Sequence, residues 1–196
     1  RAKTEKDLNE IQTPTDYKRV LIKKVIEGDN YNIYSVNKKI VAVVKKMMSE
    51  RGVELLDIAE LTCELQKQYI KDITIETCLE HVERVVMKRE VQHAILTGLE
   101  LDILAEKEML SEPLLSMLLD DYGLYGIDEI LALSIVNVYG SIGFTNFGYV
   151  DKLKPGIIGE LDRQGKETGQ CNTFLDDIVG AIAAAAASSI AHRYSV

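Results

Sequence analysis

Residues 174–193, FLDDIVGAIAAAAASSIAHR, are the stretch that decides the predicted fold. Two adjacent carboxylates, Asp176 and Asp177, precede fourteen residues without a charge, 178–191, in which alanine dominates. Alanine has the highest helix propensity, and a helix that is apolar on every side is either the middle of a core or a membrane span. Fourteen residues rise only about 21 Å, which is less than the ~30 Å hydrocarbon layer of a bilayer. We therefore expect a central, buried helix with an acidic pair at its start.

Size and composition favour a single domain. The chain has 196 residues, of which 46% are hydrophobic, enough for one substantial core. Its formal net charge of −8 argues against nonspecific binding of nucleic acid, which depends on neutralising phosphates. The three cysteines, Cys63, Cys78 and Cys171, lack metal-binding spacing, and reduced, buried thiols are typical of a cytoplasmic protein. The apolar runs are too short to predict a transmembrane segment.

The apolar residues follow a helical period almost throughout, and the pattern divides the chain in two. We expect residues 1–35 to be an N-terminal extension of uncertain order, with one helix at 15–27, and residues 36–196 to be a single helical domain. A long third helix is expected from Thr74 to Glu108, with a weak point at Gly98. Residues 142–150, IGFTNFGYV, could pair as a short hairpin. The predicted fold class is all-α, with about six or seven helices and one central apolar helix surrounded by the others.

A glycine-rich connection precedes the central helix. Eight of the thirteen glycines lie between Gly140 and Gly180. Glycine lets the backbone approach a ligand closely, and nearby cations such as Lys152 and Lys154 suit an anion such as phosphate. The alternative is a loop that is packed by its own aromatic side chains and leaves its lysines in solvent.

Two pairs of adjacent acids open two of the expected helices. They are Asp128-Glu129 and Asp176-Asp177. If these helix starts face each other, several carboxylate oxygens could bind Mg²⁺, which prefers hard oxygen ligands, with Asp151 completing or orienting the shell. Such a metal could polarise a phosphoryl oxygen.

These acids also have a structural interpretation. Thr173 and Asp176 have the spacing of a capping box, and acids favour helix N-termini in any case. Asp177 is the acid that this interpretation explains least. Spacing alone leaves the metal site and the capping role as alternatives.

A longer pattern resembles a known family. The runs are residues 130–161, ILALSIVNVYGSIGFTNFGYVDKLKPGIIGEL, and 171–189, CNTFLDDIVGAIAAAAASS. Together they resemble the phosphatidylglycerophosphatase A family, in its soluble YutG-like branch, over about residues 37–192. One family motif is V-x-D-E-x-x-G, which FLDDIVG at 174–180 matches with Asp177 in the glutamate position. The other is P-G-T-x-G-S-like; KPGIIGE at 154–160 keeps its proline and glycines but has Ile157 for threonine and Glu160 for serine.

The resemblance implies an all-helical fold and Mg²⁺-dependent hydrolysis of a phosphate monoester. The substrate of the family is phosphatidylglycerophosphate, which places the function in lipid metabolism. Asp176 and Asp177 would then be catalytic metal ligands, assisted by Asp128, Glu129 or Asp151. The implied substrate-binding residues are Lys152, Lys154, Gly156 and Gly159.

Two alternatives use the same residues. One is a phosphatase for a soluble phosphate ester, and the other is a non-catalytic helical module that binds a small anion or a partner. The membrane-bound members of the family carry transmembrane segments, so access to a lipid would here require peripheral docking through Phe144, Phe147 and Tyr149. An acidic chain is poorly suited to approach anionic lipid without local basic patches. A homo-oligomer is also compatible with the apolar content.

Overall fold

The computed structural model describes residues 33–123 and 125–194, and the chain divides into two compact units, Arg1–Gly52 and Val53–Val196. The helix expected at residues 15–27 lies outside the described residues. The predicted boundary between residues 35 and 36 therefore stays a prediction.

The described part of the first unit is one helix, α3 (Ile33–Glu50). Its apolar side chains recur at helical spacing along one face, including Ile40, Val44 and Met47. The chain leaves this helix through Gly52, whose φ of 82° is a left-handed conformation that glycine adopts without strain.

The second unit is built from helices, and every described element in it is helical, so the predicted all-α class is confirmed. Its elements are, in order, α4 (Leu55–Gln66), α5 (Ile75–Val86), α6 (Arg89–Glu106), α7 (Leu114–Leu119), α8 (Ile127–Val136), the short 3-10 helix η1 (Asn137–Tyr139), α9 (Gly140–Leu153), α10 (Ile157–Thr168) and α11 (Leu175–Tyr194).

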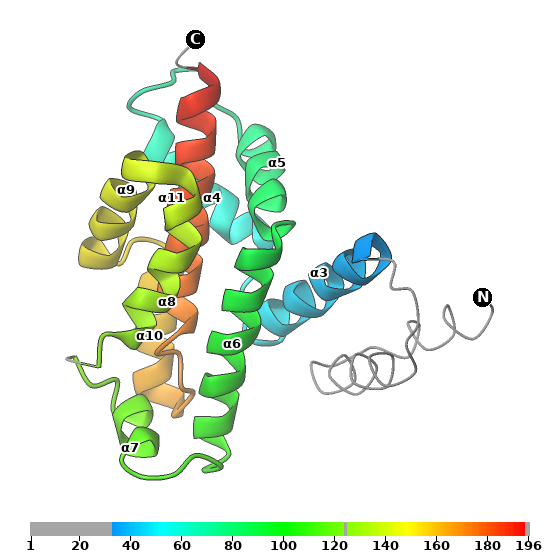
Figure 1. Ribbon diagram of the computed structural model, residues 1–196. Coiled ribbons are helices and arrows are strands. Elements are labelled where there is room, and N and C mark those ends of the chain that lie inside the picture. Colours follow the sequence, from blue (N-terminus) through cyan, green and yellow to red (C-terminus); the bar gives the residue numbers. More distant parts are fainter. Residues whose placement is uncertain (1–32, 124, 195–196) are drawn as a thin grey trace, which may run out of the picture. The chain divides into compact units, whose positions relative to one another are not determined.

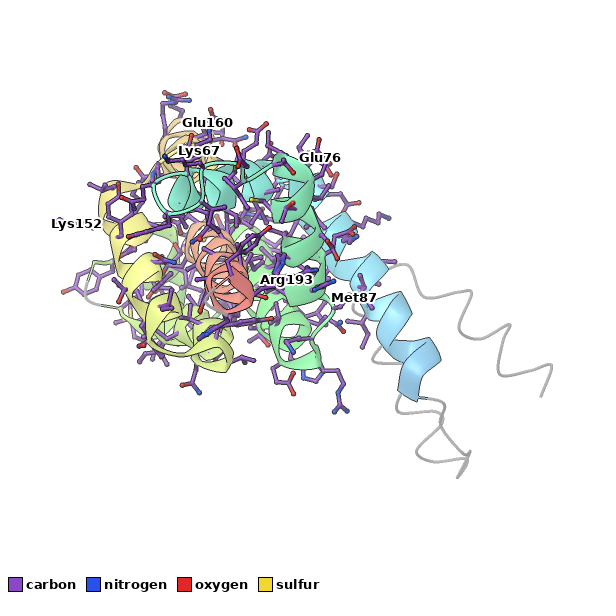
Figure 2. The ribbon with its side chains drawn as sticks, turned by 90° about the horizontal axis from the view of Figure 1, so that it is seen from above. Lys67, Glu76, Met87, Lys152, Glu160 and Arg193 are labelled. Carbon is purple, nitrogen blue, oxygen red and sulfur yellow. The ribbon has the colours of Figure 1, made fainter. Side chains whose placement is uncertain are left out.

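Helix α11 is the predicted central helix, and it lies among the others (Figure 1). It packs against α4, α5, α6, α8, α9 and α10. Figure 2, which looks along α11 from the end that carries Arg193, shows its neighbours on all sides. The five consecutive alanines 183–187 are fully buried, because small side chains let neighbouring helices approach on every face.

Glycine provides the closest of these approaches. An added Cβ at Gly98 of α6 would lie 2.5 Å from Ile178 Cδ1 and 2.9 Å from Phe174 Cβ. Gly98 is therefore not a weak point of a long helix, as the sequence suggested, but the place where α6 packs against the start of α11. The long third helix instead ends earlier, because α5 ends at Val86 and α6 begins at Arg89.

The glycine-rich connection is also helical, which corrects the predicted loop and the predicted hairpin at 142–150. Residues 140–153 form α9 and residues 157–168 form α10. Gly140 (φ 74°) and Gly156 (φ 56°) lie at the helix starts, where a reversal needs positive φ, and packing against α11 stabilises the helix between them.

Two stretches have the length and mean hydropathy of a membrane span, namely residues 127–153 and α11. The apolar window of α11 is 83% buried within the protein, as expected for a core helix. The window in residues 127–153 is only 28% buried, but η1 divides that stretch and the chain reverses direction between α8 and α9 (Figure 1). Length and composition alone do not make either stretch a span.

Candidate metal and phosphate site

The start of α11 is capped by a residue from another helix. Asp102 of α6, which is fully buried, accepts hydrogen bonds from the backbone N–H groups of Phe174 (3.1 Å) and Leu175 (3.1 Å). These two amides are among those that a helix start leaves without an intrahelical acceptor. The negative charge also lies at the positive end of the helix dipole.

The predicted capping role of Thr173 is corrected by these contacts. Its hydroxyl donates to the carbonyl of Leu118 at 2.7 Å and so ties the turn before α11 to the end of α7. Asp102 supplies the acceptor for the amides of Phe174 and Leu175 in place of Thr173.

Asp176 binds Lys154, which lines the site. Its Oδ2 is 2.6 Å from Nζ of Lys154, and its Oδ1 accepts a hydrogen bond from the backbone N–H of Asp177 at 2.9 Å. Asp151, on the last turn of α9, lies 3.8 Å from the same Nζ. Lys154 ends α9 in a left-handed conformation (φ 46°) just before Pro155, a strained position for a residue with a side chain.

Asp177 meets the acid pair of the other predicted helix start. One carboxylate oxygen from each of Asp128, Glu129 and Asp177 lies within 4.8 Å of the others. Asp128 Oδ1 accepts from the N–H of Glu129 at 3.1 Å, whereas the carboxylate of Asp177 has no hydrogen bond or ion pair to another described residue. The predicted meeting of the starts of α8 and α11 is therefore present.

These groups share one small pocket. It has a volume of about 140 Å³ and is lined by the start of α8, the end of α9, the start of α11 and residues 121–123. The reversal between α8 and α9 places Asp128 and Asp151, which are far apart in sequence, on the same pocket.

The electrostatics of the pocket disfavour its full negative charge. Burial, followed by the neighbouring acids, raises the pKa of Asp177 to about 8 and that of Asp128 to about 7. Burial raises the pKa of Asp176 to about 6, although Lys154 opposes the shift. Burial alone would lower the pKa of Lys154, but Asp176, Asp177 and Asp151 together raise it, so the lysine stays charged.

The residues present fit a divalent metal. Three carboxylates from two helices converge, and Lys154, the lysine among the described residues that lines the site, is engaged by Asp176 and Asp151. Hard oxygen donors at this spacing suit Mg²⁺, whose charge would offset the burial and the repulsion between carboxylates that raise these pKa values. Asp176 is not among these three, and its two oxygens contact Lys154 Nζ and the N–H of Asp177.

Three predicted substrate-binding residues are not on this pocket. Lys152 is exposed at the outer edge of α9 (Figure 2). Gly156 lines a separate hollow with Asp57 and Glu60 of α4. Gly159 allows close packing instead, because an added Cβ would lie 2.6 Å from the carbonyl oxygen of Lys154. Of the predicted set, only Lys154 reaches the acids.

Asp102 is the residue that the sequence reasoning missed. A signal for it was present, because Asp102 continues the apolar stripe of α6 that contains Val91, Ile95 and Leu99. A charged residue on a buried helical face needs a specific partner. Here that partner is the start of the central helix.

The comparisons with known proteins agree on one family. The family model for phosphatidylglycerophosphatase A matches residues 56–192. The uncharacterised protein YutG of Bacillus subtilis is 63% identical over 152 residues, which cover 78% of this chain and 90% of that protein. A solved structure of a protein of unknown function from Bacillus stearothermophilus has a TM-score of 0.75 and 62% identity, and covers 78% of this chain and 93% of that one. The crystal structure of YpjQ from Bacillus subtilis has a TM-score of 0.77 and 54% identity, with coverages of 81% and 96%.

Proposed function

The chain belongs to the phosphatidylglycerophosphatase A family, in its YutG-like branch, and from this premise we propose that it hydrolyses phosphate monoesters with Mg²⁺. The observation that carries the proposal is the convergence of three carboxylates from two helices beside a lysine held by Asp176. Structural ion pairs normally match charges, whereas this pocket gathers more acids than cations. Such an arrangement is typical of a site that binds a cation.

The acids divide into two roles in this proposal. Asp128, Glu129 and Asp177 would hold the Mg²⁺, which when bound polarises the phosphoryl group and lowers the pKa of a coordinated water. Asp176 and Asp151 orient Lys154 instead, since both lie within ion-pair distance of its Nζ. Asp176 thus acts through the lysine rather than as a metal ligand.

Lys154 binds the phosphate of the substrate. Its ammonium group remains charged at neutral pH because three neighbouring carboxylates raise its pKa. A fixed positive charge beside the ester offsets the charge on the phosphoryl oxygens in the transition state. The left-handed backbone at the end of α9 directs this side chain toward the start of α11, where Asp176 holds it.

We propose phosphatidylglycerophosphate as the substrate because the family carries that name. The surface beside the pocket supports access to a lipid. Residues 130–150 contain no charged side chain, and apolar residues along α8 and α9 are exposed, including Ile130 (62%) and Phe144 (39%). The start of α8 and the end of α9 both line the pocket. Docking of the exposed face of these two helices on a bilayer would therefore bring the site near the head groups.

One residue of the predicted docking set is corrected. Phe147 is 5% exposed, since its ring lies against Gly180 of the central helix, and it cannot contact a membrane. Phe144 and Tyr149 remain exposed on α9.

A panel of phosphate-release assays tests the hydrolase. Wild type should release phosphate from phosphatidylglycerophosphate in detergent micelles only with Mg²⁺, and faster than from sugar phosphates or nucleotides. Asp177→Asn should lower the rate by about 10³-fold or more, because a metal ligand is lost. Glu76→Gln, which removes an exposed acid from the first turn of α5, is the matched control and should not change it.

The same panel separates the alternatives. Mg²⁺-dependent release from a soluble ester alone would favour a phosphatase of soluble substrates. Binding of phosphate without turnover of any substrate would favour a non-catalytic module. Equal rates for wild type and Asp177→Asn would contradict the assigned site.

Sedimentation with vesicles tests the docking face. Vesicles of phosphatidylcholine with phosphatidylglycerol should carry down wild type but much less of Phe144→Asp. Met109→Asp, at an exposed apolar residue between α6 and α7, is the control. If Phe144→Asp instead converts a dimer to a monomer on gel filtration and vesicle binding is absent, the face is an interface between copies of the chain.

A further inference from the structure

We infer that Asp102 is a positioning residue for the metal site, an inference that rests on the proposed function. Asp102 lies in α6 and does not line the acid pocket, so it is not placed to bind the metal or the substrate. Its effect would pass through the start of α11, which carries Asp176 and Asp177.

Two backbone amides at the start of α11 have Asp102 as their acceptor. The N–H groups of Phe174 and Leu175 both point to the carboxylate of Asp102, at 3.1 Å in each case. A local cap would come from the residue just before the helix, as Thr74 does for α5. Here the acceptor comes from a residue more than seventy positions earlier in the chain, so the cap fixes one helix against another.

A further acid on α6 also binds the turn before α11. Glu106, one turn after Asp102, accepts a hydrogen bond from the N–H of Cys171 at 2.9 Å. The two acids of α6 therefore hold the turn from Cys171 to Leu175 at two points. The thiol of Cys171 also lies 3.6 Å from Asp102, and burial together with this carboxylate raises the pKa of Cys171 to about 11, so the thiol keeps its proton.

These contacts leave the acids of α11 available to the site. Asp102 accepts from the amides of Phe174 and Leu175, so neither acid of α11 is needed as their acceptor, and Asp176 bonds only the N–H of Asp177 within the first turn. Asp177 then meets Asp128 and Glu129, and Asp176 reaches Lys154. Whether these groups meet depends on the rotation of α11 about its axis and on its position along that axis. The hydrogen bonds from α6 help to fix both.

Two substitutions and one control test this inference. In Asp102→Asn one side-chain oxygen can still accept a hydrogen bond, while Asp102→Ala removes both acceptors. Thr74→Ala is the control, because it removes a helix cap of similar kind from α5, whose start is not part of the site. Hydrogen exchange at the amides of Phe174 and Leu175 reports on the cap, and the Mg²⁺ concentration that gives half-maximal phosphate release reports on the site.

The expected results form a graded series. Asp102→Ala should speed exchange at the two amides and raise the half-maximal Mg²⁺ concentration by about 10- to 100-fold, the range seen when partners of metal ligands are lost. Asp102→Asn should give an intermediate effect. Thr74→Ala should lower the melting temperature without changing exchange at Phe174 and Leu175 or the half-maximal Mg²⁺ concentration.

Three outcomes would overturn the inference. Unchanged exchange in Asp102→Ala would mean that Asp102 is not the cap. Faster exchange with an unchanged Mg²⁺ requirement would mean that Asp102 is a purely structural residue. If Asp102→Ala does not fold, Asp102→Asn provides this comparison. Wild type without any Mg²⁺-dependent hydrolysis would instead remove the proposed function itself, and this inference with it.

Discussion

The central helix is buried from Leu175 to Ser188, but the two ends of this buried stretch differ in how their polar groups are paired. Toward the C-terminus, Ser188 donates to the carbonyl of Tyr139 at 2.7 Å, and Ser189 lies 2.9 Å from Nδ1 of His81. At the N-terminus, Asp176 and Asp177 have raised pKa values, and Asp177 has no hydrogen bond or ion pair to another described residue through its carboxylate. The serines near the C-terminal end therefore have hydrogen-bond partners, whereas acids cluster at the N-terminal end.

This difference indicates where the fold departs from maximal stability. Fully buried alanines and paired serines stabilise the native state, whereas clustered acids in a low-dielectric setting destabilise it. Perturbed carboxylates that converge in a pocket are candidates for function because stability alone would not retain them. The following predictions test the contrast between the two ends.

After the loss already expected for Asp177→Asn, the next largest effect on hydrolysis is expected from Lys154. Lys154→Met should lower kcat/KM for phosphate release by about 10²–10³-fold, because a charged donor beside the phosphoryl oxygens is lost. Lys152→Met, on the exposed side of the same helix, should change it little. Steady-state kinetics on the two variants compares them directly, and equal losses would show that general positive charge on α9 matters rather than the lysine held by Asp176.

A second prediction concerns pH and the metal-free protein. The pKa values of Asp176, Asp128 and Asp177 rise from an ordinary 3.8 to about 6, 7 and 8 in the folded state. Between pH 4 and 8 the unfolded chain therefore releases protons that the folded chain retains. The free energy of unfolding should fall as pH rises through this window, by on the order of a few kcal/mol.

Urea unfolding at pH 5 and pH 8, with EDTA and then with Mg²⁺, measures this trend. Mg²⁺ should restore stability at pH 8, since it binds the folded state. Asp177→Asn should flatten the pH dependence and remove much of the Mg²⁺ effect. A wild-type stability that rises from pH 5 to pH 8 in EDTA would contradict the clustered charge.

A third prediction compares two glycines at helix contacts. Gly98→Ala should lower the free energy of unfolding by about 1–3 kcal/mol, because its Cβ would overlap Ile178 and Phe174 at the start of α11. Gly180→Ala should have a smaller effect, since an added Cβ there would lie 3.3 Å from its nearest neighbour, Val150 Cγ1. Thermal and urea unfolding of both variants decides the order, and a larger loss at Gly180 would be inconsistent with the packing described.

The smallest effect is expected at Ser188, near the C-terminal end of α11. Ser188→Ala should lower the free energy of unfolding by about 1 kcal/mol, because it leaves the half-buried carbonyl of Tyr139 without this donor. The Mg²⁺ requirement should stay at the wild-type value, since Ser188 lies near the opposite end of α11. A shift in that requirement would mean that the two ends of the helix are coupled.

Much of this scaffold could be predicted from the sequence because its signals are local. The alanine-rich run indicated the central helix, and the acid pairs at 128–129 and 176–177 lie at helix starts as expected. The helices α9 and α10 could not be predicted, because glycine has a low helix propensity and packing against α11 outweighs it only in the folded chain.

The site was harder to predict because its contacts join distant residues. Lys154 and Lys152 look alike in the sequence, and only the end of α9 determines which one reaches Asp176. Asp102 could have been recognised as an acid on an apolar stripe, but not as the partner of Phe174 and Leu175. Pairings of this kind depend on how the helices are placed against each other.

The reversal of the chain between α8 and α9 also bears on how the protein folds. The three carboxylates that could share an ion come from Asp128 and Glu129 on one side of that reversal and from Asp177 after two further helices. A collapsed intermediate with formed helices but loose packing would lack the chelating geometry. Mg²⁺ would therefore favour only completely folded molecules, and refolding in its presence should enrich them without speeding the early steps.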